Sequence, residues 1–99
     1  MNMSFDEFSI IVTDIINQIL DDDIGFIVKR GSNLITGFGE NSIALSSIDY
    51  VDLLVNLENR FDIYFDFDVK IETVGDIYEY ITRFEETHNS NMVTNDDEH

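Results

Sequence analysis

Residues 43–61 read IALSSIDYVDLLVNLENRF and predict an amphipathic helix. Apolar side chains recur there at spacings of three and four residues, which is the period of one face of a helix. The predicted buried stripe consists of Ile48, Val51, Leu54, Leu57 and Phe61. Two adjacent serines, Ser46 and Ser47, stand directly before this stripe, where the helix is expected to begin.

The two serines are expected to have different roles. Ser46 and Asp49 have the spacing of a capping box, in which the Ser46 oxygen accepts a hydrogen bond from a free backbone N–H. Ser47 then occupies the first helical position, and its hydroxyl is free to face solvent. A phosphate at that position would meet exposed N–H groups and the positive end of the helix dipole. Spacing alone favours simple caps and leaves a phosphoester open.

The composition narrows the classes of function. The chain has 99 residues, enough for one domain, and it lacks cysteine, so it has no disulfides or thiolate nucleophiles. Its 21 acidic and 5 basic residues give a net charge of −16, which makes nucleic acid a poor partner, because its phosphates would be repelled. The charge favours basic protein partners or simply maintains solubility. No apolar run reaches the roughly 20 residues of a membrane span, and the start MNMSFDEF does not look like a signal peptide. We therefore expect a cytoplasmic protein.

Motifs for catalysis are missing from the sequence. It contains no glycine-rich phosphate loop, no HExxH motif and no Ser/His/Asp set, and both histidines, His88 and His99, lie in or beside the polar C-terminal segment. We therefore expect neither catalytic residues nor a metal site.

The flanking segments predict further helices. Ser4 and Glu7 form a capping box before an apolar stripe, so the chain should be helical until the acidic run 21–23. A last helix is expected from Thr73, with Asp76 in a capping position. The apolar faces of these two helices comprise Phe5, Phe8, Val12, Ile15, Ile16 and Ile19 in the first, and Val74, Ile77, Ile81 and Phe84 in the last. Residues 85–99 are polar and predict a disordered tail.

Two connecting segments are ambiguous. Residues 24–41 predict either a β-hairpin or a long loop that places Phe26, Ile27, Leu34 and Ile35 on the core. Residues 61–71 alternate between apolar and polar side chains, which taken alone indicates a strand.

The longer run SIALSSIDYVDLLVNLENRFDI resembles the region around the modified serine of the acyl carrier protein family. Members of that family carry 4′-phosphopantetheine on the serine of an Asp-Ser-Leu motif, at the start of the second helix of a small acidic bundle. Ser47 matches this serine, and Ile48 stands in place of the leucine. Other matching positions are Asp49, Val51, Asp52, Leu54, Leu57, Glu58, Phe61 and Asp62, and, in a run that resembles the fourth helix, Ile71, Thr73, Val74, Tyr80 and Ile81.

The sequence also departs from the family pattern. Ser46 replaces the aspartate before the modified serine, which preserves the cap but removes a charge that the modifying enzyme usually meets. Ser46 is also a second, less favoured attachment point. Ala44 replaces a glycine, the segment before the second helix is long, and the third helix is trimmed. These departures fit a carrier of a specialised pathway better than the housekeeping fatty-acid carrier.

The resemblance implies an all-α fold: a small four-helix bundle with a short third helix and a long loop between helices 1 and 2. It divides the chain into a carrier domain, residues 1–84, and a disordered polar tail, residues 85–99. We prefer the bundle to the strand for 61–71, because a lone strand has no pairing partner. The alternative fold is α+β, with a small hairpin in 24–39.

The resemblance also implies a function without catalysis. A phosphopantetheinyl transferase would attach 4′-phosphopantetheine from coenzyme A to Ser47, and acyl groups would be carried on it as thioesters. The partners would be an acyl- or aminoacyl-loading enzyme and downstream synthases or transferases with basic docking patches, in a fatty-acid, polyketide or specialised pathway. The alternatives are an aminoacyl or peptidyl carrier, and an unmodified acidic interaction module.

Two groups of side chains follow from this prediction. The exposed rim of the second helix would be read by partner enzymes, through Ser46, Ile48, Asp49, Val51, Asp52, Val55 and Glu58. The second group forms either plain core or a cavity for the acyl chain, with plain core favoured, and comprises Leu54, Leu57, Phe61, Ile77 and Ile81.

Overall fold

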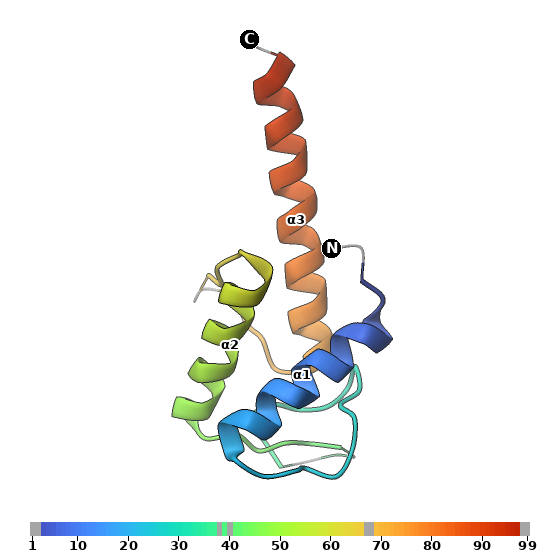
Figure 1. The fold of residues 1–99 in the computed structure, drawn as a ribbon, viewed down its shortest axis with the longest axis vertical. Coiled ribbons are helices and arrows are strands. Elements are labelled where there is room, and N and C mark those ends of the chain that lie inside the picture. Colours follow the sequence, from blue (N-terminus) through green and yellow to red (C-terminus); the bar gives the residue numbers. More distant parts are fainter. Residues whose placement is uncertain (1–2, 38, 40, 67–68, 98–99) are drawn as a thin grey trace.

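The computed structural model describes residues 3–37, 39, 41–66 and 69–97, and the side chains of those up to residue 85. The described chain forms three α-helices: α1 (Phe5–Leu20), α2 (Ser47–Phe61) and α3 (Val74–Asp97). The helix α1 packs against both α2 and the first half of α3, as Figure 1 shows. The described residues contain no strand, only an isolated bridge between Asn33 and Thr73. The prediction of an all-α fold is confirmed.

The predicted caps form at the start of all three helices. Ser4 Oγ accepts a hydrogen bond from Glu7 N at 3.2 Å. Ser46 Oγ accepts one from Asp49 N at 3.1 Å. Before α3 the cap is reciprocal, because Thr73 Oγ1 accepts from Asp76 N while an Asp76 carboxylate oxygen accepts from Thr73 N, at 3.2 and 3.1 Å. Each cap satisfies N–H groups that a helix start leaves without an internal partner.

The long connection between α1 and α2 is a loop, so the hairpin alternative for 24–39 is wrong. Its backbone is held both by bonds within the loop, such as Leu45 N to Leu34 O at 2.7 Å, and by bonds to distant residues. Three of these bonds tie it to the start of α3: Gly75 N to Arg30 O at 3.0 Å, Val74 N to Ser32 O at 3.1 Å, and Leu34 N to Glu72 O at 2.9 Å.

This loop buries other side chains than the sequence predicted. Leu34 is fully buried and Phe26 half-buried, as expected, but Ile27 and Ile35 are 50% and 44% exposed. Val28 is buried instead. An irregular loop has no fixed period, so its burial pattern follows from its hydrogen bonds to the rest of the chain.

The segment between α2 and α3 also differs from the prediction. The described residues 62–66 and 69–73 contain no helix, so the expected short third helix does not form there. The alternation survives without a strand, because Ile63, Phe65 and Ile71 point inward and are at most 7% exposed. Val69 is an exception at 43% exposed, and Phe67 lies outside the described residues.

The buried stripe of α2 differs in part from the one that the sequence predicted. Leu54 and Leu57 are buried as expected, and Leu53 joins them, but Ile48 is 74% and Val51 45% exposed. The residues Ile48, Val51 and Val55 share one helix face by their spacing of three and four. That face is exposed to solvent, and the face toward α1 forms the core.

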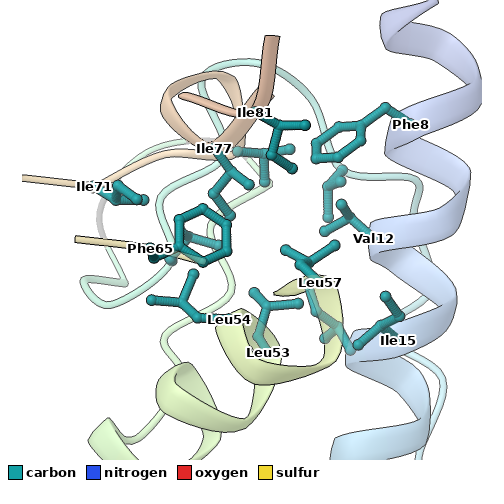
Figure 2. Close-up of a cluster of buried hydrophobic side chains, with 14 of the residues drawn as sticks. Phe8, Val12, Ile15, Leu53, Leu54, Leu57, Phe65, Ile71, Ile77 and Ile81 are labelled. Carbon is teal, nitrogen blue, oxygen red and sulfur yellow. The ribbon is translucent and has the colours of Figure 1, made fainter. Parts of the chain in front are cut away.

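Figure 2 shows this core, to which all three helices and the 62–73 segment contribute. Its labelled side chains are Phe8, Val12 and Ile15 from α1, Leu53, Leu54 and Leu57 from α2, Phe65 and Ile71 from the segment before α3, and Ile77 and Ile81 from α3.

The third helix extends well beyond this core. Its backbone remains helical to Asp97, through the segment for which the sequence predicts a disordered tail. Figure 1 shows the second half of α3 projecting away from the other two helices. The division into a carrier domain, 1–84, and a polar tail, 85–99, stays a prediction.

Candidate functional site

Ser47 is the first residue of α2, the position that the sequence predicted. Its side chain is exposed, and among the described residues it has no hydrogen-bond partner. The neighbouring Ser46 is the N-cap, with an extended backbone at φ −67° and ψ 165°, and its hydroxyl oxygen is occupied by Asp49 N. The two serines therefore differ, and of the two only Ser47 has a hydroxyl without a hydrogen-bond partner among the described residues.

The surface beside Ser47 is shallow and mixed in character. A depression of about 340 Å³ is lined by Ser47, Ile48, Val51 and Asp52. Asp49 is half-buried and Asp52 is exposed. The apolar members of this surface continue along the helix to Val55, which is 44% exposed. An apolar strip flanked by carboxylates suits a partner surface that carries apolar and basic side chains.

Glu58 has an internal role that the sequence did not reveal. Its carboxylate oxygen Oε2 accepts a hydrogen bond from Phe65 N at 2.7 Å, and the side chain is half-buried. Glu58 therefore ties the last turn of α2 to the segment that follows it. A side chain engaged in this way has less freedom to meet a partner than Asp52.

The predicted core or cavity residues lie inside the protein. Leu54, Leu57, Ile77 and Ile81 are buried, and Ile77 and Ile81 come from α3. Phe61 is half-buried, and its ring lies 5.8 Å from that of Phe8. All five contribute to the same cluster as the rest of the core.

Tyr50 is a residue near the site that the sequence reasoning missed. It lies three residues after Ser47, and its hydroxyl donates a hydrogen bond to Ile71 O at 3.2 Å. Burial, and in second place the nearby Asp76 carboxylate, raises the pKa of the Tyr50 hydroxyl above its ordinary value. The sequence carried no local signal for this contact, because the acceptor lies 21 residues further along the chain.

Ala44, the residue that replaces the family's glycine, has a backbone conformation typical of glycine. Its φ of 56° lies in the left-handed region, which costs an L-residue with a Cβ atom roughly 1–2 kcal/mol. Ser46 and Ser47 are thus reached through a strained turn that a glycine would adopt more easily.

Two further properties concern the described part of the chain. Within it, His, Cys, Asp and Glu side chains do not gather in any group of three or more that could hold a metal ion. Of its helices, none combines the length and the apolar character needed to cross a membrane.

Comparisons with known proteins agree with this geometry at the level of the fold. No protein-family model and no curated protein matches the sequence. A solution structure of a holo acyl carrier protein from Geobacter metallireducens is similar, with a TM-score of 0.61 over 81% of this chain and 87% of that chain. The sequence identity is 23%. The chain therefore has the fold of an acyl carrier protein.

Proposed function

We propose that this protein is an acyl carrier protein, which carries acyl groups as thioesters on 4′-phosphopantetheine attached to Ser47 and presents them to the enzymes of a biosynthetic pathway. The observation that carries the proposal is the exposed Ser47 hydroxyl, unpartnered among the described residues, at the first position of α2 in this fold. The protein itself catalyses nothing in this role.

The residues around Ser47 fit the group chemically. Attachment forms a bond from Ser47 Oγ to the phosphorus next to pantetheine, breaks the pyrophosphate bond of coenzyme A, releases adenosine 3′,5′-bisphosphate and gives up the serine proton. The phosphodiester produced is an anion at the N-terminal end of a 15-residue helix, where the dipole stabilises it. The bound group supplies a thiol, which this cysteine-free chain lacks.

The exposed face of α2 is the surface that we assign to partner enzymes. Ile48, Val51 and Val55 supply apolar contact area, while Asp49 and Asp52 supply charge for lysine or arginine side chains. Exposed charge of this kind mainly speeds association and adds little affinity, which suits a carrier that must leave each enzyme. Ser46 stands where the family has an aspartate, so this surface has one negative charge fewer than in the family. The transferase that modifies Ser47 has to accept a neutral side chain at this position.

The test is the intact mass of the protein after incubation with coenzyme A and a broad-specificity phosphopantetheinyl transferase. We expect wild type to gain one phosphopantetheine and Ser47→Ala to gain none. Ser46→Asp is the matched control, because aspartate keeps the cap and the Ser47 hydroxyl, so this variant should be modified as well.

The opposite results are equally informative. No gain in wild type, with a transferase shown to be active on another carrier, would overturn the proposal and favour an unmodified interaction module. A gain that persists in Ser47→Ala and disappears in Ser46→Ala would move the attachment site to Ser46. Loading with an amino acid instead of an acyl group by the native partner would identify an aminoacyl or peptidyl carrier.

A further inference from the structure

Tyr50 connects the start of α2 to the segment before α3. Its hydroxyl donates to Ile71 O, 21 residues further along the chain, at 3.2 Å. The Tyr50 side chain is half-buried and packs against the core. Because residues three apart on a helix are neighbours, this contact begins one turn from the Ser47 attachment site.

Behind Tyr50 lies an apolar interior that buried side chains close off from solvent. Leu54, Phe65 and Ile71 are at most 7% exposed, and Ile77 and Ile81 are fully buried. Figure 2 shows Leu54 from α2, Phe65 from the segment between α2 and α3, and Ile77 from α3 pointing toward one another. The Phe65 ring is further held by Tyr80, whose ring centroid is 5.0 Å away.

These two features decide where a group attached at Ser47 can go. A long alkyl chain gains free energy from leaving water in proportion to its length, so it would enter an apolar interior if one were open. Entry between α2 and residues 69–73 requires the Tyr50 hydrogen bond to break. It also requires Phe65 or Ile71 to move, since close-packed interiors tolerate extra atoms poorly.

We propose that Tyr50 acts as a latch that keeps the attached cargo outside the helical core, so that this protein carries short or polar acyl groups rather than long alkyl chains. The inference rests on the proposed attachment at Ser47. It makes Tyr50 a specificity-determining residue that acts through its contact with Ile71.

The experiment loads Ser47 with acetyl- or dodecanoyl-phosphopantetheine from the corresponding acyl coenzyme A. Methyl NMR of Leu54, Ile71, Ile77 and Ile81 reports whether the chain enters the core, and the rate of thioester hydrolysis reports its protection from water. In wild type we expect unchanged core signals and equal hydrolysis rates for the two cargoes. In Tyr50→Phe we expect shifted core signals and several-fold slower hydrolysis for dodecanoyl only.

A matched control is Tyr78→Phe, which also removes one hydroxyl-to-backbone hydrogen bond, from Tyr78 to Met3 O at 2.9 Å, but at a different place. It should behave like wild type. Core shifts in wild type loaded with dodecanoyl would overturn the inference, and so would a Tyr50→Phe variant indistinguishable from Tyr78→Phe.

A second attachment separates this inference from the proposed function. Since the chain has no cysteine, Ser47→Cys provides one thiol, whose thiolate displaces iodide from N-ethyl or N-dodecyl iodoacetamide without any transferase. Failure of the transferase to load Ser47 counts against the proposed function alone. Core shifts caused by the dodecyl group on this thiol count against the latch alone. With the dodecyl group, Ser47→Cys should keep unchanged core signals, and these should shift when Tyr50→Phe is added.

Discussion

The two faces of α2 carry similar apolar side chains, but one face is buried and the other is exposed to solvent. Leu53 and Leu57 on one face are fully buried, while Ile48 and Val51 on the other are 74% and 45% exposed. Both sets recur at helical spacing, so the period alone cannot separate them. The comparison teaches that apolar side chains at helical spacing can line both faces of one helix, and that packing alone decides which face is buried.

The largest effect is expected from shortening the buried face. Leu57→Ala should lower the free energy of unfolding by about 2–5 kcal/mol. The substitution removes most of a side chain that folding buries away from water, and it leaves a cavity in the core. Val51→Ala should change it by no more than about 0.5 kcal/mol, because the side chain is nearly half exposed. Urea unfolding measures both variants.

Binding to the loading enzyme can be measured for the same two variants. Val51→Ala should make the free energy of binding less favourable by more than it lowers the free energy of unfolding. Equal stability losses in the two variants would show that the two faces do not differ as described.

A smaller effect is expected among the acidic side chains of α2. Glu58→Ala should lower the free energy of unfolding by about 1 kcal/mol, because Phe65 N loses its acceptor. Asp52→Ala should leave stability nearly unchanged and slow association with a basic partner, most clearly at low salt. Chemical denaturation and stopped-flow association at two salt concentrations distinguish them. Loss of association without loss of stability in Glu58→Ala would contradict the internal role of Glu58.

The smallest effect concerns pH and Tyr50. Burial raises the pKa of this hydroxyl in the folded protein, with a further contribution from Asp76. A raised folded pKa means that its contribution to stability is complete below the ordinary value of 10.0 and is lost as the pH rises through the folded value. Unfolding free energies measured upward from about pH 8 should therefore fall more steeply in wild type than in Tyr50→Phe. Parallel curves would show that Tyr50 does not titrate differently in the folded and unfolded states.

Local features were readable from the sequence because they span only a few residues. The caps at Ser4 and Ser46 join groups three residues apart, and the second cap places Ser47 at the first position of α2. The inward alternation of Ile63 and Phe65 was also readable, although it occurs without a strand. The resemblance around Ser47 added the fold, and the comparison at 23% identity agrees with it.

The tertiary structure decided the features that depend on residues distant along the chain. The path of the long loop depends on bonds such as Gly75 N to Arg30 O, and no local pattern predicts a partner 45 residues away. Ile48 is exposed because no described element covers that face of α2. The Tyr50 contact with Ile71 likewise exists only after α2 has packed against the segment before α3. The sequence by itself thus determined that Ser47 begins α2, since capping is local, and packing decided what surrounds it.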